Sequence, residues 1–227
     1  MIITIDGPVA SGKTTVGKLL AKRLIFDYLY SGFLYRSIAY ALLEHTNHTI
    51  NTFSTLSISD LDSVVEQVAL EYCFMADGNC QIRIHDGVIQ EDLLMTPLID
   101  RAASMLGLNN NVRTILTDVQ RKLAHERNVI VDGRDAGTIV FPHAEYKFFL
   151  TASLDVRIQR YIKRQKKIGR MYTQEEAKKI IIERDTRDGR WLSIPNLSDN
   201  LISIDTSNMT QDQLVDFILN NYITKHN

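Results

Sequence analysis

The sequence predicts an α/β fold in which a parallel five-stranded sheet is flanked by helices. The main observation is that short apolar runs of strand length alternate along the chain with amphipathic helical stretches. A second observation is a glycine-rich turn between the first apolar run and the first helix. The chain has 227 residues and contains no repeats and no low-complexity linker, so we expect one domain, 1–227, with insertions.

The composition is that of a soluble globular protein. Apolar residues make up 44% and charged residues 23%, and 26 Lys and Arg stand against 27 Asp and Glu. The resulting net charge of -1 argues against general binding to nucleic acid, and no apolar run reaches the length of a membrane span. The N-terminus lacks the basic start and the cleavage site of an export signal. We therefore expect a cytoplasmic monomer with neither nucleic acid nor membrane as a partner.

Each element of the main body has a local sequence signal. Strands are expected at runs rich in β-branched and aromatic residues. These runs are Ile2–Ile5, Phe26–Tyr30, Val129–Val131, Tyr146–Leu150 and Leu201–Ile204. Helices are expected over Lys13–Leu24 and about Val112–Leu123. A further helix is expected after Thr210, which can form a capping box with Gln213.

The segment Leu70–Ile89 breaks the alternation and predicts an inserted antiparallel meander. It holds two Asp-Gly turns, Asp77-Gly78 and Asp86-Gly87, between β-prone runs. A two-residue hairpin at the first turn would make Cys73 and Cys80 diagonal neighbours on one face. That geometry disfavours a disulfide, so we expect two free thiols.

A second segment, Arg157–Arg190, is expected to be helical throughout, with a capping box between Thr173 and Glu176. It contains twelve Lys or Arg and five acidic residues. Its net charge is therefore +7, and the remainder of the chain carries -8. The near-neutral total conceals a cationic helical lid at about residues 155–190.

The glycine-rich turn carries the most specific motif. Residues Gly7–Thr14 match G-x-x-x-x-G-K-[ST], and the predicted strand before them and helix after them are the required context. Glycines let backbone N–H groups close around phosphate oxygens, and the helix N-terminus adds positive potential. Lys13 can reach the β- and γ-phosphates, and the hydroxyl of Thr14 can ligate Mg²⁺. The motif predicts that the chain binds a nucleoside triphosphate.

Asp132 ends the third apolar run and is followed by Gly133, Arg134 and Asp135. An acid at this place in a P-loop protein commonly holds Mg²⁺ or its water shell, so we expect Asp132 to contact the metal through water. The alternative is that Asp132 only terminates a strand. Arg134 and Asp135 would point into the same crevice, where the pair suits recognition of a base or ribose as well as an ion pair.

The other features favour a kinase for a small acceptor. The N-K-x-D motif of guanine-specific switch proteins is absent, and nucleic-acid motors are usually larger. The insert, about residues 57–100, would bind the acceptor, and the lid would close over the transferring phosphoryl group and exclude water. Arg184, Arg187 and Arg190 can present guanidinium groups along one helix face. The alternative for these arginines is a solvated face shared with acidic residues.

Residues Tyr30–Arg36 connect the second strand to a helix. Gly32 at the turn and Arg36 one helical turn later would form a site for an acceptor phosphate. An aromatic helix start that packs on the sheet explains the same residues equally well.

Taken together, these motifs resemble those of the bacterial cytidylate kinases, which phosphorylate CMP and dCMP. The resemblance covers nearly the whole chain, and its most specific part is the run D-G-R-D-x-G-T-x-V-F-P at Asp132–Pro142. It includes Ile5–Pro8 with the P-loop, Ser31-Gly32 with Tyr35-Arg36, Lys147–Ser153 and Glu183–Asp188. It implies transfer of the γ-phosphoryl group of ATP to CMP or dCMP, with Mg²⁺.

The resemblance also implies a role for each matching residue. The ATP-binding residues would be Gly7, Pro8, Val9, Ala10, Ser11, Gly12, Lys13, Thr14, Thr15 and Arg160. The CMP-binding residues would be Ser31, Gly32, Tyr35, Arg36, Ser104, Arg113, Arg134, Asp135, Arg184 and Asp188. Charge in the transition state would be neutralised by Lys13, Arg36, Arg134, Arg184 and Arg187. Asp135 would accept from the exocyclic amine of cytosine and repel the oxygen of uracil.

Three positions depart from the family pattern. Tyr30 stands where the family usually has Asp, and Leu94 stands where it has Arg. In the lid, Arg190 is one residue early, which leaves Trp191, the only tryptophan, at the place of the arginine, directly after the expected end of the lid helix at Gly189. A kinase for another small acceptor and a nucleotide-binding protein with reduced turnover are therefore the alternative functions.

Overall fold

The computed structural model of the chain describes residues 1–75, 80–85, 87–192 and 200–223, and of residues 190–192 the backbone alone. The chain divides into two compact units. The P-loop unit consists of residues 1–26 and 130–227, and the inserted unit consists of residues 27–129. No helix in the described residues is long and apolar enough to cross a membrane.

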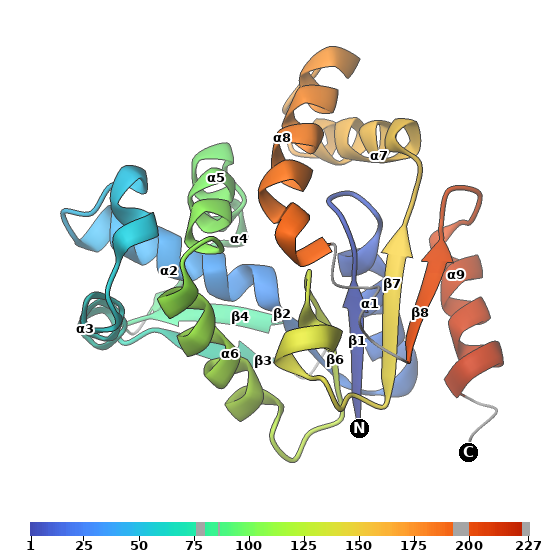
Figure 1. Ribbon diagram of the computed structural model, residues 1–227, viewed down its shortest axis with the longest axis horizontal. Coiled ribbons are helices and arrows are strands. Elements are labelled where there is room, and N and C mark those ends of the chain that lie inside the picture. Colours follow the sequence, from blue (N-terminus) through green and yellow to red (C-terminus); the bar gives the residue numbers. More distant parts are fainter. Residues whose placement is uncertain (76–79, 86, 193–199, 224–227) are drawn as a thin grey trace. The chain divides into compact units, whose positions relative to one another are not determined.

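The main sheet has the predicted five strands. In sheet order these are β2 (Asp27–Tyr30), β6 (Val129–Asp132), β1 (Ile2–Asp6), β7 (Tyr146–Thr151) and β8 (Leu201–Asp205). β7 runs parallel to both of its neighbours, β1 and β8 (Figure 1). The predicted parallel sheet is confirmed, and each of the five predicted apolar runs forms one strand within one residue at either end.

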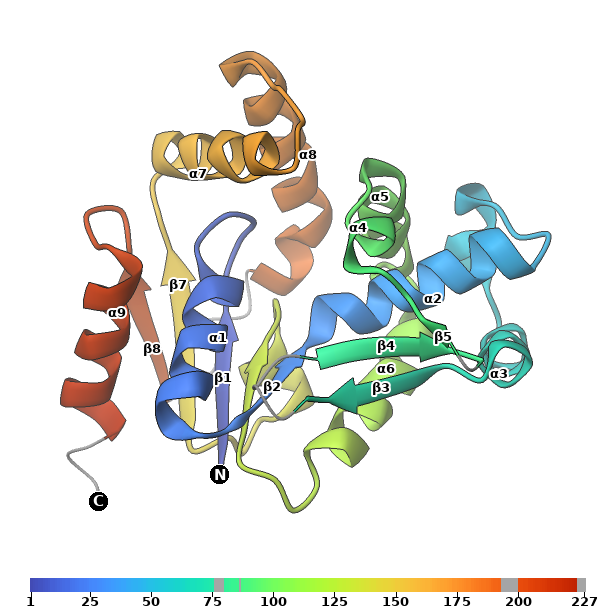
Figure 2. The ribbon, with the colours of Figure 1, turned by 180° about the vertical axis from the view of Figure 1, so that it is seen from behind.

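Helices cover the sheet of the P-loop unit. α1 (Lys13–Leu24) follows the P-loop with the predicted bounds, and α9 (Gln211–Ile218) begins at the predicted capping box of Thr210 and Gln213. The two lie side by side on one face of the sheet, where Figure 2 shows them in front of β1 and β8. Two short π-helical turns, η2 (Ala136–Val140) and η4 (Leu219–Ile223), follow β6 and α9.

The segment expected to form the lid contains two helices, and residues 168–173 between them are not helical, so the prediction that Arg157–Arg190 is helical throughout is wrong there. α7 (Leu154–Lys167) ends at Ile168, and Gly169 adopts a φ of +76°, a left-handed conformation that suits glycine. α8 (Gln174–Leu192) then begins behind the predicted capping box, in which the Thr173 N–H donates to Glu176 and the Glu176 N–H donates back. α8 continues through Gly189 to Leu192, so the expected end of the helix at Gly189 is wrong as well.

The inserted unit is mostly helical. Its elements are α2 (Ser31–His45), the 3₁₀ turn η1 (Ile50–Thr55), α3 (Ile58–Val68), α4 (Glu91–Leu94), α5 (Pro97–Leu106) and α6 (Asn110–Ala124). Side-chain caps begin three of them: Ser57 caps α3, Thr96 caps α5 and Asn109 caps α6. The helices enclose an apolar core, in which Leu34, Leu42, Phe53, Val68 and Leu106 are among the buried side chains.

The predicted meander is present as a three-stranded antiparallel sheet, β3 (Glu71–Phe74), β4 (Cys80–Ile84) and β5 (Gly87–Val88). Its register differs by one residue from the prediction: Cys73 pairs with Gln81, and Cys80 pairs with Phe74. The two cysteines are therefore on opposite faces, and both are free thiols as expected. A two-residue turn cannot give this register, because five residues separate Phe74 from Cys80. Asp77, Gly78 and Asp86 of the predicted turns lie outside the described residues.

Candidate functional site

The P-loop connects β1 to α1 through three residues with positive φ angles. These are Gly7 at +144°, Ala10 at +60° and Gly12 at +105°. At Gly7 a side chain is excluded by space as well, since a Cβ atom would lie 2.1 Å from the carbonyl oxygen of Leu150. Gly12 is the N-cap of α1, so the loop delivers its N–H groups to the positive end of the helix.

Lys13 is the first residue of α1, and its side chain folds back onto the loop. Its Nζ donates to the carbonyl oxygen of Pro8 at 2.7 Å, and the side chain is buried. Burial and the nearby charge of Arg134 lower the pKa of Lys13 well below its usual value, against the opposing effect of Asp132. The amine therefore lies in an environment that disfavours its positive charge when no anion is bound.

Thr14 and Asp132 meet at the carboxyl end of the sheet. The Thr14 hydroxyl donates to Oδ2 of Asp132 at 2.7 Å, and Asp132 is the last residue of β6. Both offer oxygen atoms, which are the ligands that Mg²⁺ prefers, and the carboxylate is almost fully buried. The residues present therefore fit the predicted metal.

The buried carboxylate of Asp6, to which the motifs assign no role, holds the loop after β6 to the end of β1. Its two oxygens accept hydrogen bonds from the N–H groups of Ala136 at 2.9 Å and Gly137 at 2.7 Å. Burial raises the pKa of Asp6 to about 7, although these two hydrogen bonds act in the opposite direction. At Gly137 a Cβ atom would lie 2.4 Å from Oγ1 of Thr4, so the close approach of this loop requires glycine. In the sequence, Asp6 is marked by its place in the family-like run Ile5–Pro8, directly before Gly7.

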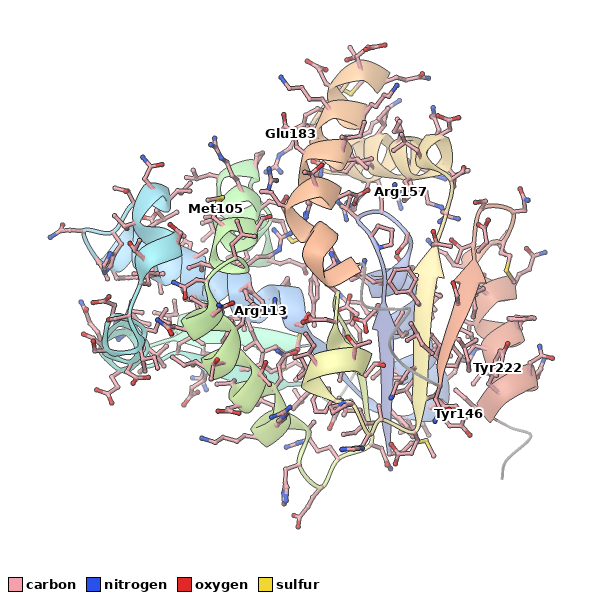
Figure 3. The ribbon with its side chains drawn as sticks, viewed as in Figure 1. Met105, Arg113, Tyr146, Arg157, Glu183 and Tyr222 are labelled. Carbon is pink, nitrogen blue, oxygen red and sulfur yellow. The ribbon has the colours of Figure 1, made fainter. Side chains whose placement is uncertain are left out.

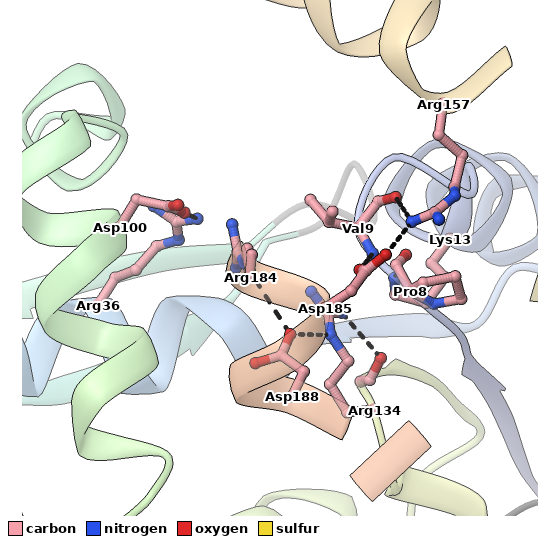
Figure 4. Close-up of polar contacts among 11 residues, drawn as sticks. Pro8, Val9, Lys13, Arg36, Asp100, Arg134, Arg157, Arg184, Asp185 and Asp188 are labelled. Atoms are coloured by element: carbon pink, nitrogen blue, oxygen red, sulfur yellow. Dashed lines mark hydrogen bonds and ion pairs between the residues drawn. The ribbon is translucent and has the colours of Figure 1, made fainter. Parts of the chain in front are cut away.

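Arg134, Arg184 and Asp188 form a cluster between the loop after β6 and helix α8 (Figure 4). Asp188 Oδ2 lies 2.7 Å from Nε of Arg134 and 4.0 Å from Nε of Arg184. Burial alone would raise the pKa of Asp188, but the charges of Arg134 and Arg184 outweigh it and hold this pKa below its usual value. Three of the predicted CMP-binding residues are thus brought together. Arg187 lies on the same helix, and Asp135 is buried at the start of η2.

Arg160 of α7 is fixed against the other side of the P-loop. Its guanidinium group donates to Oγ1 of Thr206 at 2.8 Å, to the carbonyl of Thr206 at 2.6 Å and to the carbonyl of Ser11 at 3.3 Å. Thr206 follows β8 and is buried. This places the predicted ATP-binding arginine on the loop that the motif assigns to ATP.

The remaining predicted CMP-binding residues belong to the inserted unit. Ser31, Gly32, Tyr35 and Arg36 occupy the first two turns of α2, Ser104 is in α5 and Arg113 is in α6. Arg36 is buried, donates to the carbonyl oxygen of Leu94 at 3.0 Å and forms a close ion pair with Asp100. Tyr30 packs its ring on Gly32, where a Cβ atom would lie 2.7 Å from the ring.

The structure describes in part the residues that depart from the cytidylate-kinase-like pattern. Leu94 is buried beside Phe33 and Ile82, and its carbonyl rather than its side chain serves Arg36. Trp191 lies in the last turn of α8, but its side chain and that of Arg190 are outside the described residues. The sequence motifs assign no role to Asp185 or to Arg157 (Arg157 is labelled in Figure 3), and both residues contact the P-loop.

The site has a phosphate-binding loop at the carboxyl end of a parallel sheet, with a buried acid beside its threonine and arginines around its lysine. This arrangement defines a P-loop phosphotransferase. Comparison with known proteins identifies the family within this class. A family model described as cytidylate kinase matches residues 3–224. The cytidylate kinase of Thermotoga maritima is 34% identical over 96% of this chain and 94% of its own length. That of Caldanaerobacter subterraneus subsp. tengcongensis is 37% identical over 94% and 91%. The chain belongs to the cytidylate kinase family.

A solved structure agrees with the fold. The crystal structure of an uncharacterized protein from Eubacterium ventriosum is 16% identical, covers 99% of this chain and 98% of its own, and has a TM-score of 0.53. At this level of identity the similarity shows the architecture alone.

Proposed function

We propose that the protein transfers the γ-phosphoryl group of ATP to CMP or dCMP, producing ADP and CDP or dCDP. The observation that carries this proposal is a complete donor-phosphate loop in a chain whose family match extends over residues 3–224. We also propose that the whole chain acts as one kinase domain. In it the segment at about residues 57–100 serves the acceptor, and α7 and α8 form the lid.

The donor would be held by the P-loop. The N–H groups of residues 7–15 and the ammonium group of Lys13 would bind the phosphates, and Arg160 would contribute from the lid. Mg²⁺ would be held by the hydroxyl of Thr14 directly and by Asp132 through water. When bound, the metal neutralises charge on the transferring phosphates. The contact of 2.7 Å between Thr14 and Asp132 supports this pairing of ligands.

The acceptor would be recognised through its base, its pentose and its phosphate. Ser31, Arg113 and Asp135 are proposed to read cytosine, and Asp135 is a buried carboxylate that can accept from the cytosine amine. Ser104, Arg184 and Asp188 would contact the pentose. Gly32, Tyr35, Arg36 and Arg134 would serve the phosphate.

Catalysis would depend on positive charge rather than on a covalent intermediate. Lys13, Arg36, Arg134, Arg184 and Arg187 are proposed to stabilise the charge that develops as the phosphoryl group moves. The effect of Arg134 on Lys13 supports this role, because the positive charge of Arg134 disfavours the charged form of Lys13. A bound polyphosphate would remove this repulsion, so the site is more favourable with its substrates than without them.

The deciding experiment measures ADP release with ATP and, in separate reactions, CMP, dCMP, UMP, AMP or no acceptor. We expect turnover with CMP and dCMP well above that with UMP or AMP. Turnover with a different acceptor would identify a kinase for that acceptor. Binding of ATP without turnover on any acceptor would identify a nucleotide-binding protein with reduced activity.

A further inference from the structure

Two lid residues with no role so far, Arg157 of α7 and Asp185 of α8, contact the P-loop at Val9 (Figure 4). The Asp185 carboxylate accepts from the N–H of Val9 at 3.4 Å and from Nη1 of Arg157 at 2.5 Å. The same Nη1 donates to the carbonyl oxygen of Val9 at 3.3 Å. The Val9 peptide is therefore held by α8 on its N–H side and by α7 on its carbonyl side.

Apolar packing strengthens the same contact. The side chain of Val9 is buried against Ile158 and Tyr161 of α7 and against Ala177 and Ile181 of α8. All five side chains are at most 8% exposed. The root of the lid is thus packed onto the loop that carries the phosphate-binding N–H groups.

Arg157 has hydrogen-bonding capacity that the described residues do not use. An arginine offers five N–H donors in a planar fork, but within the described part of the chain the hydrogen bonds of Arg157 all use Nη1. Its Nε is buried with no hydrogen-bond partner among the described residues. A guanidinium group held on a phosphate loop with donors to spare matches the geometry that arginine uses to bind phosphate oxygens.

We propose that Arg157 is an additional residue that binds the donor triphosphate and that Asp185 is its positioning residue. Asp185 holds one edge of the guanidinium group on the Val9 peptide, and the other N–H groups are left for phosphate oxygens. The inference rests on the proposed function, because its ligand is the triphosphate of ATP. Asp185 acts only through Arg157 and does not touch the nucleotide.

The test is a double-mutant cycle on the full chain with a non-hydrolysable ATP analogue, whose affinity is measured by calorimetry. Arg157→Ala removes charge-assisted hydrogen bonds and is expected to weaken binding about 10- to 100-fold. Asp185→Asn is expected to weaken it about 3- to 10-fold, since the oriented charge pair is lost. In the Arg157→Ala background, Asp185→Asn should cause no further loss. Glu183→Gln is the matched control, because it removes the same charge from an exposed position on the same helix.

Three further measurements separate positioning from a general effect on the fold. Melting temperatures of the variants should stay near that of the unmutated protein, and the KM for CMP should not change. Guanidinium ion should partly restore the affinity of Arg157→Ala for the analogue, which a purely structural defect would not permit. If Asp185→Asn does not fold, Asp185→Glu replaces it, because the longer acid keeps the charge and displaces the carboxylate.

Unchanged analogue affinity in Arg157→Ala would overturn the inference. So would full additivity in the cycle, or equal losses of affinity for the analogue and for CMP. The proposed function fails in a different way, through the absence of phosphoryl transfer in the unmutated protein. In that case the cycle with the analogue still decides the role of Arg157.

Discussion

The surroundings of Lys13 act directly on the pKa of its amine. Its side chain is buried, Arg134 adds positive charge nearby, and the Nζ has a carbonyl oxygen as its hydrogen-bond acceptor. Each of the first two effects lowers the pKa of Lys13. An anion that enters the loop would oppose both effects by favouring the charged amine, so the interaction between Lys13 and a triphosphate is expected to be strong.

Lys13→Ala is expected to lower the rate of phosphoryl transfer by at least about two orders of magnitude, as for the loss of a preorganised electrostatic group. The measurement is the steady-state rate of ADP release with saturating CMP. Lys22→Ala is a suitable control, since Lys22 is on the same helix but exposed. Near-normal turnover in Lys13→Ala would show that the P-loop assignment of this lysine is wrong.

Substitution of Asp135 tests its proposed role in recognising the base of the acceptor. Asp135→Ala should reduce the preference for CMP over UMP, mainly by weakening CMP, because an unpaired polar group in a closed site costs about 1–3 kcal/mol. The ratio of kcat/KM for the two acceptors is the quantity to measure. Asp135→Asn should lose less with CMP and gain with UMP, because an amide can also donate to the uracil oxygen. Equal losses for CMP and UMP would indicate that Asp135 is structural.

At the scale of elements, the sheet and the P-loop were predictable because their signals are local. Each strand is a short apolar run between turn residues, and the helix Lys13–Leu24 begins directly after a glycine motif whose spacing is diagnostic. The starts of α8 and α9 were equally predictable, because capping boxes at Thr173 and Thr210 precede them.

The predictions were wrong or incomplete where a local signal is weak, and where the contact joins residues that are distant in sequence. Periodicity alone could not reveal the break between α7 and α8, because charged residues continue on both sides of Gly169. The helix continues through Gly189, since a single glycine costs only about 1 kcal/mol in a helix interior. Asp6 and Asp185 lie in runs that match the family, but their contacts were not predictable, because each accepts from backbone N–H groups that are distant in sequence.

The helix α4 offers a test of the departure at Leu94. The side chain of Leu94 is 1% exposed and packs beside Phe33 and Ile82, so Leu94→Arg would bury an unpaired charge. We expect the free energy of unfolding to fall by more than about 3 kcal/mol in urea titrations. Leu94→Met, which nearly conserves volume, should cost less than about 1.5 kcal/mol. A stable Leu94→Arg protein with raised affinity for CMP would contradict this and show that the position accepts the family arginine.

At the scale of the whole molecule, charge is segregated rather than balanced. The segment 157–190 carries +7 against -8 elsewhere, yet two of its acids, Asp185 and Asp188, pair with Arg157 and Arg134 beside the P-loop. These two acids therefore orient arginines beside the P-loop, and the segment keeps a net positive charge. This distribution agrees with a protein whose substrates are polyanions of small size.

Asp6 links the site to the stability of the whole molecule. Its pKa is about 7 in the folded chain against a usual value of 3.8, so between these values the folded protein holds a proton that the unfolded chain has released. The contribution of Asp6 to stability is therefore complete below about pH 4 and is lost as the pH rises through 7. Above that pH, the buried carboxylate costs on the order of 4 kcal/mol relative to an unperturbed one.

The contribution of Asp6 to stability can be isolated with Asp6→Asn, because the amide side chain does not titrate. The amide can accept from only one of the two N–H groups of Ala136 and Gly137, so this variant should be less stable than the unmutated protein at low pH. The difference between the two proteins should shrink as the pH rises from about 5 to 8, because only the unmutated protein loses stability through Asp6 over that range. Urea midpoints measured at several pH values supply the comparison, and other titrating groups cancel in the difference. Parallel pH profiles would mean that Asp6 is ionised throughout, held as a carboxylate by its two backbone donors.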